Sequence, residues 1–404
     1  MGIWRVSDST RSLGDRAPAI RAVLPIVYLT LMASLVAGHA FAATRSEKLN
    51  YLFDRAAALA ASDGKSATRA FRCGSTIRPM VDMSKLFGFY AATSTRSVID
   101  KKAMARYTKR VWPTNALMKQ LGRFRDMYLL NTAPRREVAA CTVRNLRAWA
   151  DAGALLGNLD DNDLMGHRQA ALIIAWQTYS MANAYSLVAA EPGLAQDDLA
   201  AIRAWFTRLA DVLVAEFTPP AAPREPQWRW LDATANHSNW AAVAVGSVGA
   251  ITGDRGKLDF AMAELRKALA QVEESGAFPY EVRRGARSLQ YQNFAMAAVA
   301  GLVALADANS VALTPAEEAA LLRAARFTFE QSFDPSRLEA MTGQRQDIKP
   351  GVLGWTDVLH RHLARTDPQL ADQIEARVRP YRPFVDDFLG GEITRLFNPQ
   401  AALP

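Results

Sequence analysis

The sequence contains few of the residues that bind metals or form cross-links. Only 2 of its 404 residues are cysteine and 5 are histidine. The cysteines lack the spacing of a zinc finger or of a Cys-x-x-Cys redox motif. His360 and His362 are two positions apart, a spacing that does not place both side chains on one face of a helix. These absences argue against a zinc protein and a thiol oxidoreductase, and we expect no metal site.

Several motifs of common enzyme classes are also missing. The chain has no glycine-rich phosphate loop and no Gly-x-Ser-x-Gly nucleophile elbow. The acidic run Asp160-Asp161-Asn162-Asp163 lacks the glycine and the distal glutamate of a calcium loop, so we expect a turn and a helix cap there. A glycoside hydrolase with two catalytic carboxylates remains open, because acidic residues are scattered along the whole chain.

Strand patterns are lacking as well, since no stretch of convincing length alternates apolar and polar residues. Residues 198–217 show helical spacing best, with apolar side chains every three or four positions. Another helix should begin at Thr314-Pro315-Ala316-Glu317, where Thr314 suits the N-cap and Glu317 closes a capping box. Further helices are predicted over residues 46–62, 98–130 with a break near Pro113, 135–152, 164–188, 237–251, 257–274, 285–309 and 352–364.

Roughly ten to twelve successive helices with short links favour antiparallel hairpins. A closed or nearly closed ring of such hairpins would leave a central cleft. No repeat of fixed period indicates a solenoid. No low-complexity linker divides the chain, so residues 43–404 are expected to form a single domain, in which the proline-rich stretch 218–227 is a loop.

The N-terminal 42 residues differ in character from the rest. They begin with a basic region that holds four arginines, at Arg5, Arg11, Arg16 and Arg21. An apolar stretch over residues 22–37 follows, and Ala40-Phe41-Ala42 has the small-large-small pattern of a signal peptidase site. We predict a signal peptide over residues 1–42 and export to the periplasm. The alternative is a membrane anchor, but the apolar run is shorter than the about 18–20 residues that span a bilayer. No other stretch is expected to cross a membrane.

The chain is basic, with a net charge of +8. Residues 1–42 hold four arginines and two aspartates, so the exported chain keeps a charge of +6. An acidic polymer, a membrane surface and nucleic acid are the obvious partners of such a protein, and export argues against nucleic acid. The plain alternative is that the charge only aids solubility.

Cys73 and Cys141 are predicted to form one disulfide, because a single cysteine pair in an oxidising compartment is normally bonded. The bond would close a long loop and stabilise the fold by about 4 kcal/mol in the chain-entropy model. A catalytic thiol is the alternative interpretation.

Two segments carry residues suited to proton transfer. In Asn236-His237-Ser238-Asn239-Trp240, His237 lies between amides and a hydroxyl at the start of a helix; alternatively, Asn236 is only an N-cap. In residues 281–291, a helix would place Arg284, Arg287 and Tyr291 on one face. Two arginines beside a tyrosine hydroxyl can bind a carboxylate and transfer a proton, although a solvated basic face would have the same spacing.

Both segments resemble signatures of the alginate lyases of polysaccharide lyase family 5. Asn236-His237-Ser238 followed by Trp240-Ala241-Ala242 is similar to the Asn-Asn-His-Ser-Tyr-Trp-Ala-Ala motif of that family. Residues 276–296 resemble a second signature, in which Gly, Leu-Pro, Glu and paired basic residues lead to Arg-Ala-Leu and Tyr-His-Asn-Tyr. Residues 141–156 and 383–399 are similar to two further motifs. The resemblance runs from about Cys73 to Pro399.

The resemblance implies an all-α fold, an incomplete α/α toroid with a central cleft and a mobile lid near the N-terminal region. It implies β-elimination on a mannuronate-rich acidic polysaccharide without a metal or another cofactor. Asn236 and Arg284 would neutralise the uronate carboxylate, which makes the C5 proton removable. Tyr291 would move protons at C5 and at the C4 oxygen, with Arg284 favouring its phenolate or easing proton exchange. His237 would assist as a neutral base or as an orienting group. Substrate contacts are expected from four further side chains: Tyr90, Trp240, Arg287 and Arg395.

The sequence departs from the family pattern at several positions. Where the family has Asn, Tyr, His and Tyr, this chain has Ala235, Asn239, Gln292 and Phe294. A lysine typical of the lid region is missing, and Phe89-Tyr90 is the local match. The class of reaction is therefore better indicated than the substrate, and other β-linked uronates such as glucuronan stay open.

A second function stays open beside the lyase. A non-catalytic periplasmic protein could bind acidic polysaccharide and support exopolysaccharide export. The presence of all four residues Asn236, His237, Arg284 and Tyr291 favours the enzyme, because binding alone does not require that set. We expect a monomer, and the sequence does not decide between endo and exo action.

Overall fold

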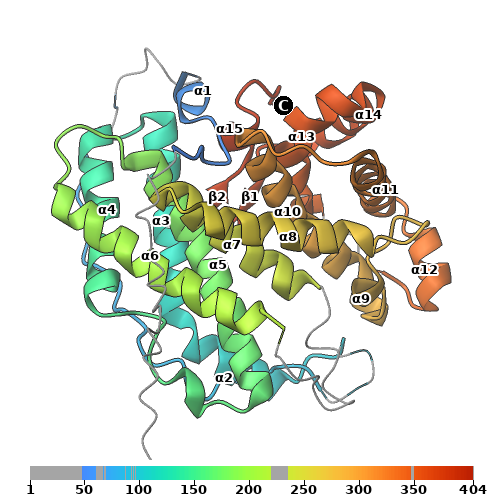
Figure 1. Cartoon of the computed structure of the whole chain (residues 1–404), viewed down its shortest axis with the longest axis horizontal. Helices are drawn as coiled ribbons and strands as arrows, with labels where there is room; N and C mark the ends of the chain where they lie inside the picture. Colours follow the sequence, from blue (N-terminus) through green and yellow to red (C-terminus); the bar gives the residue numbers. More distant parts are fainter. Residues whose placement is uncertain are drawn as a thin grey trace, which may run out of the picture. The chain divides into compact units, whose positions relative to one another are not determined.

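The computed structural model describes residues 48–403 except 61–66, 68–69, 87, 92, 94, 96, 220–234 and 347–349. The predicted signal peptide, residues 1–42, lies outside the described residues, as does most of the predicted loop 218–227. Residues Arg45–Pro404 make up one compact unit. Figure 1 shows the chain with its helices labelled in order.

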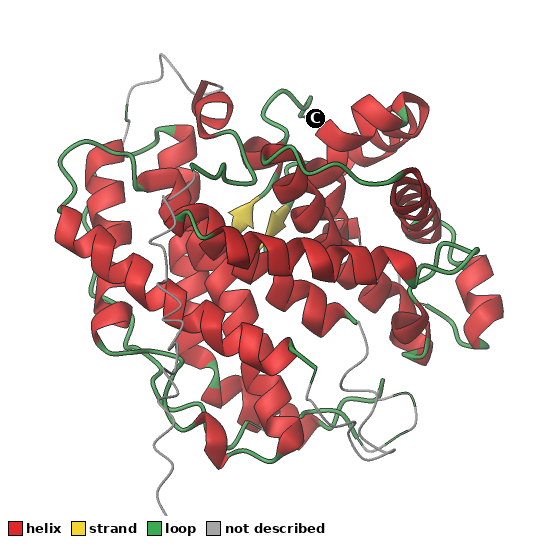
Figure 2. Ribbon diagram, in the orientation of Figure 1, coloured by secondary structure: helices red, strands yellow, loops and turns green. Residues whose placement is uncertain are grey.

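The described part of this unit is mostly helical (Figure 2), which confirms the all-α prediction. Its main helices are α2 (Lys101–Arg110), α3 (Trp112–Leu130), α4 (Arg135–Asp151), α5 (Leu164–Val188), α6 (Gln196–Phe217), α7 (Asn236–Thr252), α8 (Arg255–Ala270), α10 (Ser288–Ala308), α11 (Pro315–Gln331), α13 (Trp355–Thr366) and α14 (Pro368–Val378). Shorter helices are α1 (Arg55–Ala60), α9 (Pro279–Val282), α12 (Ser336–Thr342) and α15 (Thr394–Phe397), with single 3₁₀ turns η1 (Leu159–Asp161), η3 (Gly285–Arg287), η4 (Pro350–Gly354) and η5 (Arg379–Tyr381). Two short strands, β1 (Val385–Asp386) and β2 (Gly391–Glu392), pair antiparallel.

Several predicted helix ends are confirmed by their capping contacts. The Thr314 hydroxyl accepts a hydrogen bond from the Glu317 N–H at 3.3 Å, and the Glu317 carboxylate accepts one from the Thr314 N–H at 2.8 Å. The acidic run at Asp160 forms the predicted turn and cap, because Asp163 accepts a hydrogen bond from the Gly166 N–H at the start of α5. The break near Pro113 is also present, between α2 and α3.

The predicted helix over residues 46–62 is wrong in its first half. Residues 48–54 are not helical, and α1 begins only at Arg55. Asp54 explains the late start, because its carboxylate accepts a hydrogen bond from the Ala57 N–H at 3.1 Å and so acts as an N-cap. The helices α12 and α14 were not predicted.

The helices form two layers, as expected for an α/α toroid. An inner series α3, α5, α7, α10 and α13 is in contact from each helix to the next. The outer helices α4, α6, α8, α11 and α14 pack against this series and partly against one another. The inner helices α5, α7 and α10 are buried along most of their length, which explains why they are apolar around their whole circumference. The predicted incomplete α/α toroid is confirmed.

The helix α10 corrects one expectation about membranes. Gly285–Ala308 is long and apolar enough to cross a bilayer by length and composition alone, although no such stretch was predicted. In the fold, 78% of its most apolar window is buried. Its composition is therefore accounted for by its place in the core.

Two glycines allow α7 and α10 to approach each other closely. A Cβ atom on Gly246 would lie 2.4 Å from the Leu305 side chain, and one on Gly301 would lie 2.9 Å from the Val243 side chain. These contacts advance in the same direction along both helices, so α7 and α10 run parallel. Their N-terminal ends therefore lie at the same end of the core, and both ends carry predicted site residues.

The predicted disulfide between Cys73 and Cys141 is confirmed, with a Cα–Cα distance of 5.6 Å. It ties the extended segment before α2 to the buried face of α4. The indole of Trp149, also on α4, donates a hydrogen bond to the Ile77 carbonyl at 2.9 Å. The N-terminal segment is thus fixed to the outer layer before it reaches the site.

A buried histidine links three helices on the other side of the unit. The His362 ring on α13 has Nδ1 3.1 Å from the Asp307 carboxylate on α10 and Nε2 3.0 Å from the Glu318 carboxylate on α11. Burial lowers the pKa of His362, whereas the hydrogen bonds and charges of Asp307 and Glu318 raise it. Together the two carboxylates have the larger effect, so the pKa lies above its usual value. His362 therefore joins α13 to α10 and α11 through two carboxylates.

Candidate active site

The site begins at the N-terminus of α7, where Asn236 is the first helical residue. Ala235 and Ser238 cap the start of the helix. The Ala235 N–H donates a hydrogen bond to the Ser238 hydroxyl at 3.2 Å, and that hydroxyl donates one to the Ala235 carbonyl at 3.0 Å. Asn236 is therefore not the N-cap, and its side chain is available for other contacts. His237 follows it, half-buried in the first turn.

The Asn236 side chain is held by a buried carboxylate. Its Nδ2 lies 3.0 and 2.9 Å from the two oxygens of Glu281 on α9, and the Asn236 backbone N–H donates to Glu281 Oε1 at 2.9 Å. Glu281 is 2% exposed. Burial raises its pKa to about 7, while the hydrogen bonds from Asn236 and the charge of Arg284 act in the opposite direction.

Glu281 is positioned by the loop that precedes α9. The Phe278 N–H donates to Gln292 Oε1 at 3.0 Å, and Gln292 Nε2 donates to the Thr328 hydroxyl at 3.1 Å. Gln292 is fully buried. Gln292, which stands where the family has histidine, therefore connects α10 to the loop and to α11 and is not in contact with solvent.

A continuous helix would have placed Arg284, Arg287 and Tyr291 on one face, but the segment does not form one helix. Gly285 has a φ of +55°, and the chain passes from α9 through η3 before α10 begins. The three side chains nevertheless converge. The Arg284 guanidinium carbon lies 3.9 Å from the Tyr291 ring centroid and 4.9 Å from that of Tyr90, and the Arg287 guanidinium carbon lies 5.6 Å from the Tyr90 ring centroid.

Tyr90 reaches the site from a different part of the chain. Its hydroxyl lies 2.7 Å from the Tyr291 hydroxyl. The segment around it is a narrow hairpin, in which Ala91 N–H donates to the Val98 carbonyl at 2.9 Å. Arg287 Nε donates to the Ser97 carbonyl at 2.9 Å and so fastens the hairpin to the start of α10. The predicted contact residues Tyr90 and Arg287 therefore lie beside Tyr291.

Tyr291 is held as a neutral phenol in the free protein. Burial raises its pKa well above the usual value, and Tyr90 and Glu281 act in the same direction. Arg284 lowers the pKa, as predicted from the sequence, but the guanidinium lies over the ring face and its effect is smaller than that of burial. A phenolate therefore requires removal of a proton from the resting site.

The two remaining predicted substrate contacts, Trp240 and Arg395, both have partners within the protein. Trp240 is 1% exposed and packs among Tyr179, Phe294 and Phe388, so its prediction as a substrate contact is wrong. The helix α7 is buried along most of its length, so a tryptophan in its second turn packs in the core. Arg395 lies on α15, where its guanidinium pairs with Glu392.

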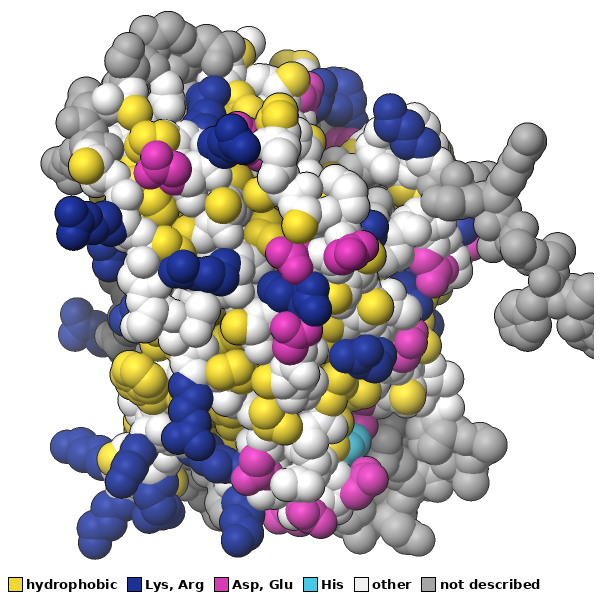
Figure 3. Space-filling view, turned by 90° about the vertical axis from the view of Figure 1, so that its left-hand side faces the viewer, with side chains coloured by type: hydrophobic (Ala, Val, Ile, Leu, Met, Phe, Trp, Pro, Cys, Tyr) yellow, Lys and Arg dark blue, Asp and Glu magenta, His cyan; other side chains and the backbone are white. Residues whose placement is uncertain are grey.

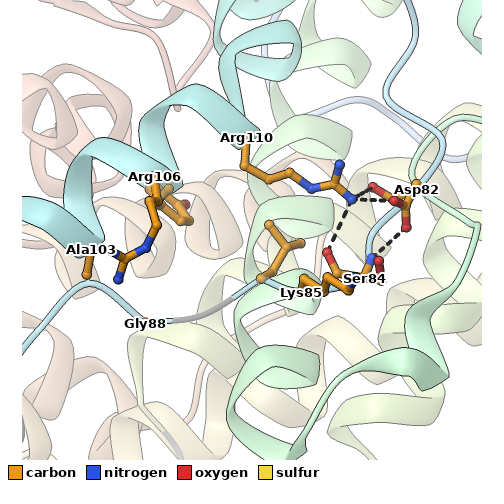
Figure 4. A pocket seen from close by; sticks show the side chains of 9 residues that line it. Asp82, Ser84, Lys85, Gly88, Ala103, Arg106 and Arg110 are labelled. Carbon is orange, nitrogen blue, oxygen red and sulfur yellow. Dashed lines mark hydrogen bonds and ion pairs between the residues drawn. The ribbon is translucent and has the colours of Figure 1, made fainter.

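A basic pocket adjoins the hairpin that carries Tyr90. It has a volume of about 390 Å³ and lies between α2 and the segment 82–88 (Figure 4). Lys85, Arg106 and Arg110 line it, and Arg110 donates to Asp82 at 2.5 Å. The Tyr107 ring, also in its wall, lies 4.9 Å from the Phe89 ring beside Tyr90.

The charge on α2 is of one sign. Its ten residues include five lysines or arginines and no acidic residue. Figure 3 shows that Lys and Arg side chains also gather at the lower left of the face drawn there, whereas acidic side chains are scattered over it. Such uneven positive charge suits a polyanionic ligand. Within the described residues, no group of three or more His, Cys, Asp or Glu side chains is arranged to hold a metal ion.

Glu281 is the site residue to which the sequence had assigned no role. It stands in Phe278-Pro279-Tyr280-Glu281-Val282, where a lone acidic residue among apolar ones was the available signal. A carboxylate in such a run is buried only if it has hydrogen-bond partners. The partner, Asn236, lies 45 positions away and could not be identified from spacing.

Comparison with known proteins identifies a family and a fold that match this chain. A family model described as alginate lyase matches residues 89–338. The alginate lyases of Pseudomonas putida (strain GB-1) and Cobetia marina are 27% and 28% identical to this chain, over 83% and 84% of its length and 88% and 85% of theirs. The solved structure of alginate lyase A1-III from Sphingomonas species A1 is similar in fold, with a TM-score of 0.66 at 20% identity over 86% of this chain and 95% of that one. A variant of A1-III complexed with a tetrasaccharide gives a TM-score of 0.69, also at 20% identity, over 86% of this chain and 94% of that one.

Proposed function

Since the chain belongs to the alginate lyase family and is therefore a polysaccharide lyase, we propose that it cleaves mannuronate-rich polymer by metal-independent β-elimination in the periplasm. The observation that supports this proposal most directly is the contact between Tyr291, Tyr90 and Arg284. The Tyr291 hydroxyl contacts that of Tyr90 there, and the Arg284 guanidinium lies over the Tyr291 ring, near the Asn236–Glu281 pair.

The reaction needs the charge of the uronate carboxylate to be reduced before the C5 proton can leave. Arg284 supplies a positive charge, and Asn236 supplies an amide from the neighbouring helix end. Hydrogen bonds to the carboxylate stabilise the negative charge that develops on it when the C5–H bond breaks. This stabilisation is the main contribution that the fold makes to the first step.

Tyr291 is the group proposed to move the proton. As phenolate it takes the C5 proton; the C4–C5 double bond forms, the C4–O4 bond breaks, and the same hydroxyl returns its proton to O4. In mannuronate the C5 hydrogen and O4 lie on the same side of the ring, so one group can serve both steps. Tyr90 can donate a hydrogen bond to the phenolate across their 2.7 Å contact. His237 orients the substrate or assists as a neutral base.

The activity has a direct test. β-Elimination creates an unsaturated uronate that absorbs in the ultraviolet, so the purified protein should raise absorbance on polymannuronate within a panel of acidic glycans. Polyguluronate and glucuronan serve as comparisons for specificity. A glycoside hydrolase or a binding protein would produce no such rise, and its absence on every uronate would refute the proposal.

Export and metal independence are tested separately. Protein recovered from the periplasmic fraction should begin at Ala43, after loss of residues 1–42. Uncleaved protein in the membrane or cytoplasmic fraction would contradict export. Treatment with a chelator should leave turnover largely intact; complete loss restored by a divalent cation would show that the elimination depends on a metal.

A further inference from the structure

The contact between Asn236 and Glu281 constrains which atom of the amide faces the substrate. An ionised carboxylate can only accept hydrogen bonds, so it must face the NH₂ group of Asn236. The structure has this arrangement, with Nδ2 at 3.0 and 2.9 Å from the two carboxylate oxygens. Asn236 Oδ1 is then turned away from Glu281, and it is buried without a hydrogen-bond partner among the described residues.

This orientation does not suit the binding of a uronate. An amide oxygen is an acceptor and cannot donate to the carboxylate of a substrate. A buried acceptor without a partner is itself unfavourable. The carboxylate of a substrate requires the NH₂ group of the amide instead.

We propose that Glu281 is a positioning residue whose protonation turns the Asn236 amide so that its NH₂ group faces the uronate carboxylate. This inference rests on the proposed lyase function. Both Glu281 oxygens now accept from Nδ2; in the neutral state Oε2 carries a proton and donates a hydrogen bond to Asn236 Oδ1. The other oxygen keeps its hydrogen bond from the Asn236 backbone N–H at 2.9 Å. Every hydrogen bond at Glu281 is then satisfied, and Nδ2 is free to donate to the substrate.

The surroundings of Glu281 favour this proton. Its carboxyl is 2% exposed, and burial raises its pKa to about 7, so the proton is available near neutral pH. Arg284 opposes protonation of Glu281 in the free protein. A bound uronate carboxylate would share the positive charge of Arg284 and add negative charge near Glu281. Binding should therefore favour the neutral form.

Other titratable or charged groups lie on the elements packed against α9. They are Arg283 on the segment after α9, Tyr291 on α10, His237 on α7, and Arg337 and Glu339 on α12. Any of these could add its own pH dependence to substrate binding. The test must therefore compare variants at Glu281 itself.

The experiment measures binding without turnover. In the Tyr291→Phe protein, affinity for a mannuronate tetrasaccharide is measured by calorimetry from pH 6 to 9, with Glu281 intact and with Glu281→Gln. With Glu281, affinity should fall by up to about tenfold per pH unit above pH 7, and binding should take up a proton, because one group must be protonated. With Glu281→Gln this slope should be lost, since a neutral amide can donate to Asn236 Oδ1 at every pH. Glu264→Gln is the matched control, because Glu264 is also buried but lies on α8 and pairs with Lys267.

The outcomes separate this inference from the proposed function. An unchanged pH slope in Glu281→Gln would overturn the inference and assign the titration to another group. A folded Glu281→Gln protein that binds no tetrasaccharide at any pH would also overturn it, because the neutral side chain is the one required for binding. Thermal melting checks that this protein is folded. Absence of binding with Glu281 intact, together with no elimination by the unchanged chain, would instead refute the lyase function on which the inference rests.

Discussion

Replacing Tyr291 with phenylalanine removes one oxygen atom and leaves the ring that packs against Arg284 and Phe294. The same change at Tyr90 removes the other half of the same hydrogen bond, whose oxygens are 2.7 Å apart. Each variant should lose about 1 kcal/mol of stability, the usual net contribution of such a hydrogen bond. The two variants should therefore be equally stable and differ only in which of the two hydroxyls remains.

Their activities should differ strongly. General acid–base groups contribute typically about 10²–10⁴-fold, and a group that serves both proton transfers should lie at the upper end. Tyr291→Phe should therefore lower kcat by about 10⁴-fold on the best uronate polymer. Tyr90→Phe keeps the transferring hydroxyl and should lower kcat by roughly 10-fold or less, in proportion to one lost hydrogen bond. The assay is initial-rate ultraviolet absorbance at saturating polymer, with thermal melting of both variants.

The pH dependence of kcat tests the same mechanism in the unchanged protein. Because burial raises the pKa of Tyr291, the phenolate is the minor form at neutral pH. If Tyr291 removes the C5 proton, kcat should rise with pH between 6 and 9, by up to about tenfold per unit for one ionisation. A flat profile would mean that another base removes the proton. Equal losses of kcat in Tyr291→Phe and Tyr90→Phe would refute the assignment of proton transfer to Tyr291.

Three other perturbations test the fold and the charged surface. Gly276→Ala should lower the free energy of unfolding by roughly 2–5 kcal/mol in denaturant, because Gly276 has a φ of +92° and a Cβ there would lie 2.4 Å from a backbone oxygen. Gly343 has a φ of +64° and nothing within 4 Å of such a Cβ, so Gly343→Ala should cost only about 1–2 kcal/mol. His362→Gln should lower the melting temperature most below about pH 6.5, and the difference should shrink as pH rises through the raised pKa of His362, because the stabilising charge is lost there. Arg106→Gln in the basic pocket should raise KM by about two- to fivefold at low salt, and by less at high salt, without changing kcat. The control Lys267→Gln on α8 should leave KM unchanged. A rise in KM that is independent of ionic strength would argue against charge attraction.

Local features of the fold were predictable because their causes lie within a few residues. The helix at Thr314 is an example, since its cap joins positions three apart. The start of α5 follows from Asp163, whose side chain caps the helix. The disulfide was predictable for a different reason, because only two cysteines are present to form it.

Predictions were wrong where one local sequence pattern is compatible with two different structures. The spacing of Arg284, Arg287 and Tyr291 indicated one helix face, but the positive φ of Gly285 interrupts the helix before α10. Trp240 belongs to a motif and was taken for a substrate contact, yet its ring is buried among Tyr179, Phe294 and Phe388. The burial of Trp240 depends on side chains from other segments, which a local pattern does not identify.

By itself, the sequence determined the helical class, most helix ends, the disulfide and the residue types available for β-elimination. Tertiary structure alone decided which of these residues meet. Tyr90 and Tyr291 are 201 positions apart, and Asn236 and Glu281 are 45 apart. Such contacts depend on how whole helices pack, because burial and close approach are properties of the assembled layers. The same packing places Glu281 out of water, and that burial, which no local pattern specifies, raises its pKa to about 7.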